Sequence, residues 1–210
     1  MSEPDLHTRF TSLWARLAPR GDAEATFEAV LRGWLEPHRR YHGLDHLRDC
    51  LARLDEAPAT AEVRDLAEAA LWYHDVVYRP GASDNEALSA KLARDALLST
   101  GALPEQAEEV ARLVRLTDHT APAEDDLGAL VCDVDLSILG RSAGEYEEYE
   151  HRIREEYRHV PEPLYRAGRA RVLAGLLRRH PLFRSDHFRQ RFEGQARLNL
   201  RRSLETLRRA

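Results

Sequence analysis

The chain has 210 residues and a mass of 24.0 kDa; 43% of its residues are hydrophobic and 32% are charged, so it can bury a sizeable core. No apolar run approaches the roughly 20 residues that cross a bilayer, and the first ten residues, MSEPDLHTRF, lack the apolar segment of a secretion signal. Two cysteines, Cys50 and Cys132, are too few for a disulfide framework. We therefore expect a cytoplasmic protein without a membrane partner.

A stripe of apolar residues with the spacing of a helix begins near the N-terminus, at Leu6, Phe10, Leu13 and Leu17. Similar segments follow along most of the chain, and clusters of turn-forming residues separate them. We count about nine or ten helices and find no internal repeat. The sequence therefore predicts a single all-α domain over residues 1–210.

The segment YHGLDHL at 41–47 contains His42 and His46, whose spacing of four residues would direct both side chains to one face of a helix. The segment WYHDVVYR at 72–79 contains His74 and Asp75 among apolar neighbours. Burial of an unpaired carboxylate costs several kcal/mol. Asp75 therefore needs a partner, which is either another side chain or a metal ion.

The helix that follows these two segments is predicted to begin with Ser83 or Asp84 as its N-cap. Glu86 then lies in the first turn, where the helix dipole favours an acid. Asn85 and Glu86 come one helix after the His74–Asp75 pair. Glu86 is thus either a dipole-compensating acid or a residue that positions water at a site.

The segment VCDVDLSILG at 131–140 fits two patterns. Its apolar residues alternate with Asp133, Asp135 and Ser137, as in a strand, but a longer stripe from Leu127 to Ile138 fits a helix. No other segment offers a strand for pairing, so we predict a helix here.

The net charge of −5 is unevenly distributed, since 13 arginines and three acids follow residue 165. A basic end can bind nucleic acid. However, 30 of the 31 basic residues are arginine and Lys91 is the single lysine, which indicates a compositional preference of the genome rather than a binding surface. We therefore expect no nucleic-acid partner.

Imidazole nitrogens and carboxylate oxygens that converge from several helices form sites for divalent transition metals. In chain order, His46, His74–Asp75 and Asp135 resemble the H…HD…D signature of the HD-domain metal-dependent phosphohydrolases, an all-helical superfamily. The closer resemblance is to small bacterial predicted HD phosphohydrolases, and it extends from about residue 38 to 202. The segments that carry it are YHGLDHL, WYHDVVY, DNEALSA and DVDLSILG and, more loosely, REEYRHVP, GRARVL and EGQARLNL.

This resemblance implies that His46, His74, Asp75 and Asp135 bind one divalent metal ion, whether Mn, Mg, Co, Ni, Fe or Zn. It places the metal-site core at about 38–140, with helices in 142–207 packing on it. The YHxxxH and DLS segments also resemble motifs of cyclic-nucleotide phosphodiesterases, which implies that His42 is a proton donor. The alternative for His46 and Asp75 is a structural hydrogen bond between helices, and the alternative for His74 is a hydrogen-bonded histidine of the core.

Several further residues have more than one interpretation each. Asp133 either replaces Asp135 as ligand or orients a ligand histidine. His119 completes the pocket wall, holds a second ion, or is a surface residue at a helix end. The remaining candidates either contact a substrate phosphate or belong to a solvated face; they are Arg154, Tyr157 and Arg169.

The implied activity is hydrolysis of a phosphomonoester or phosphodiester, such as a nucleotide, by metal-activated water with His42 as general acid. Two other functions remain open. One is a non-catalytic module that binds a nucleotide or a protein partner. The other is a di-iron oxygenase of the same fold, which needs extra histidines between Asp75 and Asp135, where only His119 occurs. The sequence leaves the oligomeric state open.

Overall fold

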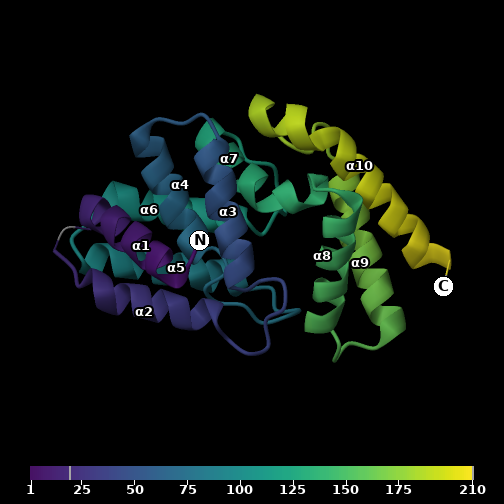
Figure 1. Ribbon diagram of the computed structural model, residues 1–210, viewed down its shortest axis with the longest axis horizontal. Helices are drawn as coiled ribbons and strands as arrows, with labels where there is room; N and C mark the ends of the chain where they lie inside the picture. Colours follow the sequence, from purple (N-terminus) through teal and green to yellow (C-terminus); the bar gives the residue numbers. More distant parts are fainter. Residues whose placement is uncertain (19, 210) are drawn as a thin grey trace. The chain divides into compact units, whose positions relative to one another are not determined.

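A computed structural model describes residues 1–18 and 20–209, and its regular elements within these ranges are all helices (Figure 1). The described residues form ten α-helices and one 3₁₀ helix, without a strand, which confirms the predicted all-α class. They divide into two compact units, Met1–Cys132 and Asp133–Ala210. The single domain expected over the whole chain stays a prediction, and each unit is described by itself below.

The first unit contains six complete helices and the beginning of a seventh, coloured from purple to teal in Figure 1. Their boundaries are α1 (Glu3–Leu17), α2 (Ala23–Trp34), α3 (Leu44–Glu56), α4 (Ala61–Tyr73), α5 (Asn85–Ser99), α6 (Pro104–Leu116) and α7 (Asp126–Asp135), of which the last ends in the second unit.

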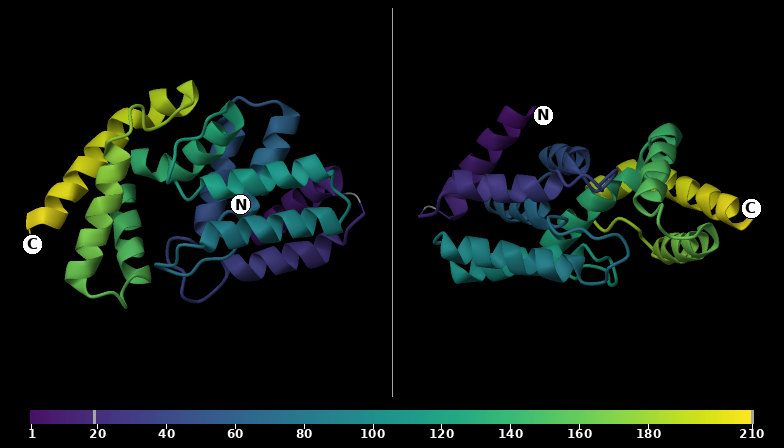
Figure 2. Two further views of the ribbon diagram at one scale, coloured as in Figure 1. Left: turned by 180° about the vertical axis from the view of Figure 1, so that it is seen from behind. Right: turned by 90° about the horizontal axis from the view of Figure 1, so that it is seen from below.

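Helix α4 is the central element of the first unit, because it packs against α1, α3, α5 and α6. All seven residues from Ala67 to Tyr73 are buried. Burial on every side of a helix, here with Glu68 as the one charged residue, is typical of an interior position. The C-terminal end of α4, which His74 directly follows, therefore lies inside the unit. Helices α5 and α6 lie side by side on it, as Figure 2 shows.

The second unit contains η1 (Leu136–Gly140), α8 (Ala143–Glu156), α9 (Glu162–Leu177) and α10 (Asp186–Arg209). Helix α10 packs against both η1 and α9. Gly140 lies directly against Phe192 of α10, and a Cβ at this position would collide with that residue. The amide of Asn199 also donates to the carbonyls of Leu139 and Arg141, both at 2.9 Å. The end of η1 is therefore closely packed on α10.

Residues 131–140, which fit both a strand and a helix by their pattern, are helical as predicted. Helix α7 continues to Asp135 and the 3₁₀ helix η1 follows directly. In the described part of the chain, no helix is long and apolar enough to cross a membrane.

Candidate metal centre

Helix α3 carries two of the side chains that build the candidate centre. His46 and Cys50 are one helical turn apart on α3 and both are buried. His42, by contrast, lies in the turn before α3, which begins at Leu44 with Gly43 as N-cap. The expectation that His42 and His46 share a helix face is therefore wrong, because the helix starts after His42. The two rings are still close, with centroids 6.0 Å apart.

The C-terminal end of α4 supplies the other part of the centre. His74 is the C-cap residue of α4, and Asp75 follows it in a turn. Nδ1 of His74 lies 2.8 Å from the carbonyl oxygen of Leu71. A carbonyl only accepts, so Nδ1 carries the hydrogen, and the Nε2 of a neutral His74 presents its lone pair. This backbone contact orients His74 as a metal ligand is usually oriented.

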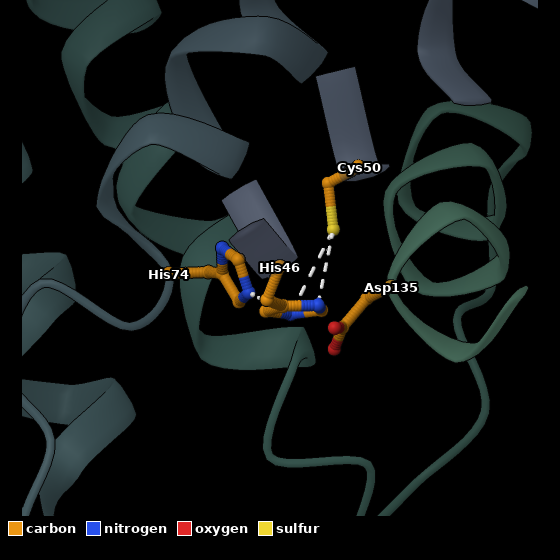
Figure 3. A group of neighbouring side chains, drawn as sticks. All are labelled: His46, Cys50, His74 and Asp135. Atoms are coloured by element: carbon orange, nitrogen blue, oxygen red, sulfur yellow. Dashed lines mark hydrogen bonds between the residues drawn. The ribbon is translucent and has the colours of Figure 1, made fainter. Parts of the chain in front are cut away.

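His46, Cys50 and His74 form one buried group of donor atoms (Figure 3). The Nε2 atoms of His46 and His74 are 3.1 Å apart. Oδ2 of Asp75 lies 3.2 Å from Nε2 of His74 and 3.8 Å from Nε2 of His46. Donor atoms of His46, Cys50 and His74 all lie within 4.8 Å of one another. The first unit thus supplies two histidines and a cysteine to a group that could hold one metal ion, and Asp75 lies beside both histidines.

The separations between these atoms fit a shared ion. Nitrogen and oxygen ligands lie about 2.0–2.2 Å from zinc, so two of them at a tetrahedral angle are roughly 3.3–3.6 Å apart. The observed 3.1 and 3.2 Å separations are close to this range. Imidazole, carboxylate and thiolate donors together suit a divalent transition metal rather than an alkaline-earth ion. The residues present therefore fit the implied metal.

The surroundings of Asp75 favour its ionised form. Burial by itself would raise the pKa of its carboxyl group, but the adjacent His74, and then His42 and His46, lower this pKa well below its usual value. The ionised carboxylate, which this lowered pKa favours, is the form that binds a cation.

Arg39 holds the two segments that carry the site. Its buried guanidinium group donates to the carbonyl oxygens of His42 at 2.9 Å, Asp75 at 2.6 Å and Val76 at 3.1 Å. The side chain of Glu36 balances its charge at 2.7 Å. One cation therefore joins the turn before α3 to the turn after α4.

Helix α5 holds the chain that follows Asp75. The hydroxyl of Ser89 accepts the N–H of Val77 at 3.1 Å, and the amide of Asn85 both accepts from and donates to the backbone of Arg79. Asn85 and Ser89 are buried and four residues apart, so they face one side of α5. The sequence DNEALSA thus contributes structural contacts next to the centre.

Aromatic rings surround the imidazoles. Trp34 lies next to His74, with ring centroids 5.3 Å apart, and Tyr41 lies next to His46 at 4.8 Å. Tyr78 stacks on His42 at 4.3 Å. His42 is half-buried whereas His46 and His74 are buried, so His42 is the most accessible of the three histidines.

Glu86 and His119 both lie in the first unit. Burial raises the pKa of Glu86, and the negative charges of Asp75 and Asp118 raise it further, opposed by its own N–H and by His119. His119 follows α6 and has a positive φ of 53°, a conformation that non-glycine residues seldom adopt. Glu86 is therefore close enough to Asp75 to sense its charge, and His119 is close enough to sense that of Glu86.

Asp133 and Asp135 belong to the second unit. Asp133 is buried and accepts the backbone N–H groups of Arg184 at 3.0 Å and Ser185 at 2.7 Å, immediately before α10. This carboxylate therefore binds the backbone of the two residues that directly precede α10. Asp135 is half-buried at the C-terminal end of α7, and it is also drawn in Figure 3.

The three candidate phosphate contacts also lie in the second unit, where both arginines have acidic partners. Arg169 donates to Glu150 at 2.7 Å and to the hydroxyl of Tyr149 at 2.7 Å. Arg154 pairs with Glu162 at 2.9 Å, and it donates to the carbonyl of Tyr157 at 2.7 Å. These contacts compensate both guanidinium charges within the unit.

Cys50 is the member of the donor group that sequence reasoning missed. Its one signal was the spacing of four residues from His46 in a segment already predicted to be helical. That spacing places a sulfur on the same helix face as a ligand histidine.

No protein-family model, no curated protein and no solved structure matches this chain. The residues and their geometry therefore carry the functional argument.

Proposed function

We propose that this protein is a metal-dependent phosphohydrolase of the HD type, which cleaves a phosphomonoester or phosphodiester such as a nucleotide. The observation that supports this most strongly is the buried group of His46, His74 and Asp75 with the more accessible His42 beside it. Asp135 would complete the ligand set, as the resemblance to HD-domain proteins implies.

When bound, one divalent metal ion would lower the pKa of a water ligand toward neutrality and offset negative charge on a phosphate. His42 would donate a proton to the departing oxygen, a task that suits a group with a pKa near 7. Stacking on Tyr78 holds its ring in place. Glu86, whose raised pKa reflects burial near Asp75, would orient the attacking water.

The experiment that tests this function has two parts. First, the metal content of the purified protein is measured together with that of Asp75→Ala. Second, both proteins are screened for phosphate release from nucleotides and from nitrophenyl phosphate esters. We expect about one metal ion per wild-type chain, metal-dependent release, and loss of both in the variant.

Binding of a nucleotide to the metal-loaded protein without any release of phosphate would replace this proposal with the non-catalytic module. Wild-type protein that binds no divalent metal would exclude the metal centre itself.

A further inference from the structure

We propose that Cys50 is a metal ligand through its thiolate, and that it makes the centre select zinc, cobalt(II) or iron(II) over magnesium and manganese. This inference rests on the metal centre of the proposed function, and it adds a ligand that the H…HD…D pattern does not contain. The bond would form between Sγ and the ion, and the thiol proton would leave to solvent.

The position of the sulfur atom supports this role. Sγ of Cys50 lies 3.7 Å from Nε2 of His46. A sulfur ligand lies about 2.3 Å from zinc and a nitrogen ligand about 2.0–2.1 Å, so at a tetrahedral angle the two are roughly 3.6 Å apart. The Sγ–Nε2 separation is therefore the one expected for two ligands of one ion. Because Sγ also lies 3.8 Å from Nδ1 of His46, the imidazole ring has to turn for Nε2 and Sγ to face the same ion.

The local structure of α3 restricts both residues. His46 and Cys50 are one turn apart on a continuous helix, and both are buried in the interior of the first unit. The donor atoms of Cys50, His46 and His74 lie within 4.8 Å of one another. Three donors carried by two packed helices are thus held close together before an ion binds.

The other cysteine provides a natural contrast. Cys132 is also buried, but its thiol donates to the carbonyl of Leu116 at 3.5 Å. Its surroundings are the side chains of Ala123 and Ala129. Cys132 thus serves as a matched control, with the same side chain and burial but an apolar environment.

A thiolate changes which metals the centre prefers. Soft sulfur donors favour zinc, and together with imidazole they suit cobalt(II) and iron(II), whereas magnesium and manganese favour oxygen ligands. A centre of two imidazoles, one carboxylate and one thiolate would therefore bind zinc in strong preference to magnesium.

The test is a cobalt(II) titration of the reduced full-length protein, followed by absorption spectroscopy. Wild type and Cys132→Ser should show both the visible bands of coordinated cobalt and a near-ultraviolet thiolate-to-cobalt band. Cys50→Ser should lose the thiolate band. Because loss of an outer-shell partner already costs about 10- to 100-fold in metal affinity, loss of this ligand should weaken zinc binding by at least about 100-fold.

Cys132→Ser keeps the test decisive even if Cys50→Ser does not fold, because Cys50 is then the one remaining thiol of the chain. Visible cobalt bands without a thiolate band in Cys132→Ser would overturn the role of Cys50 and leave the proposed function intact. The absence of any cobalt bands in the wild type would overturn both.

Discussion

Arg39 shows how a single side chain can organise a site that it does not enter. Its guanidinium group bonds three carbonyl oxygens, including those of His42 and Asp75, and it lies over the rings of Trp34 and Tyr78. A planar fork with five donors can do this, whereas a lysine ammonium group cannot.

We therefore expect Arg39→Lys to weaken metal binding by about 10- to 100-fold, as is usual when a supporting contact of a ligand is lost. The measurement is a zinc competition titration at a temperature where circular dichroism shows the variant to be folded. Arg40→Lys is the matched control, because Arg40 is adjacent to Arg39 in the chain but is exposed. A zinc affinity of Arg39→Lys equal to that of Arg40→Lys would contradict the positioning role.

Substitution of His42 and substitution of His46 should have different effects on turnover and on metal binding. General acid catalysis contributes about 10²- to 10⁴-fold, so His42→Ala should lose about that much turnover and keep its metal. His46→Ala should lose the metal as well. The measurements are metal content and turnover on a nucleotide and on a nitrophenyl ester.

A nitrophenyl leaving group needs little protonation, so this substrate should partly rescue His42→Ala and not His46→Ala. Equal loss of metal in the two variants would show that His42 is a ligand or a structural residue rather than a proton donor.

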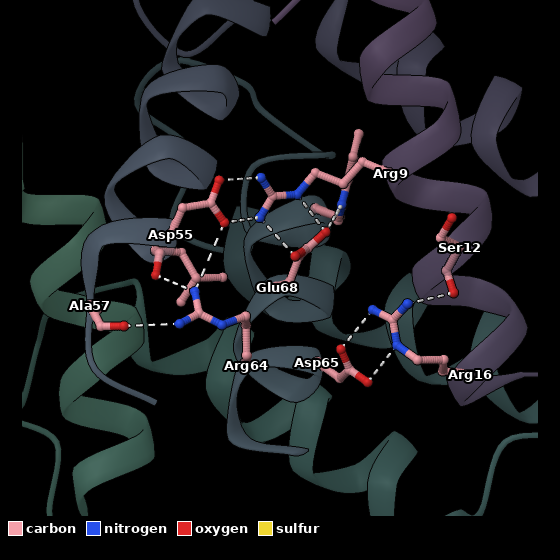
Figure 4. Close-up of polar contacts among 10 residues, drawn as sticks. Arg9, Ser12, Arg16, Asp55, Ala57, Arg64, Asp65 and Glu68 are labelled. Atoms are coloured by element: carbon pink, nitrogen blue, oxygen red, sulfur yellow. Dashed lines mark hydrogen bonds and ion pairs between the residues drawn. The ribbon is translucent and has the colours of Figure 1, made fainter. Parts of the chain in front are cut away.

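At the scale of elements, salt bridges of very different burial connect α1 to its neighbours (Figure 4). Arg9 bonds the buried carboxylate of Glu68 on α4 through two nitrogens at 2.8 Å, and it also bonds Asp55 on α3. Arg16, two turns further along α1, bonds Asp65 on α4 from an exposed position. The two pairs have similar geometry and unequal access to water.

Arg9→Ala should destabilise the protein by about 3–5 kcal/mol, because it leaves the charge of Glu68 buried without its partner. Arg16→Ala should cost about 0–1 kcal/mol, as is typical of exposed pairs. Urea denaturation at neutral pH measures both free energies of unfolding. Equal losses in the two variants would show that burial of Glu68 does not control the strength of the contact.

Helix α10 provides the pH-dependent contact of the second unit. Glu193 accepts the N–H groups of Leu182 and Phe183, and it pairs with Arg197. Burial opposes ionisation, but these N–H groups and Arg197 outweigh it, so the pKa of Glu193 is lowered. A lowered folded-state pKa means that the contribution to stability is present above the unfolded pKa of about 4.3.

We expect Glu193→Gln to be less stable than wild type at pH 7, with a difference that shrinks as the pH falls below about 4.3 toward the folded-state pKa. Urea unfolding of both proteins from pH 7 to pH 3 measures this difference. Glu205→Gln, at an exposed position on the same helix, should show little difference at any pH. A difference for Glu193→Gln that persists unchanged at pH 3 would contradict the assignment.

For the molecule as a whole, metal binding should appear as resistance to heat. An ion that binds only the folded protein stabilises it by about 2.7 kcal/mol at 100 times Kd. For a chain of this size, that corresponds to a rise in Tm of about 5–11 °C. We expect this rise for the wild type in excess zinc relative to a chelator, and we expect it to be absent in Asp75→Ala.

Differential scanning calorimetry in both conditions measures the effect. Identical melting of the wild type with and without metal would mean that no ion stabilises the folded chain.

The helical class and much of the centre followed from local patterns in the sequence. Apolar spacing indicates helices because side chains three and four residues apart share a helix face. Residues 131–140 fit both periods, and the lack of a second strand for pairing correctly predicted a helix there. His74 and Asp75 are adjacent in sequence, so little beyond the burial of α4 was needed to bring both to one place.

Contacts between distant segments were decided by tertiary structure. Periodicity shows which face of a helix is buried but not which element covers it, so the bonds of Arg39 to Asp75 and of Asp133 to Ser185 could not be foreseen. The position of His42 depended on where α3 begins. The four-residue spacing of His42 and His46 suggested a helix that includes His42, but α3 begins two residues later, at Leu44, with Gly43 as its N-cap. Cys50 became a candidate ligand only when the packing of α3 against α4 brought its sulfur to the two histidines.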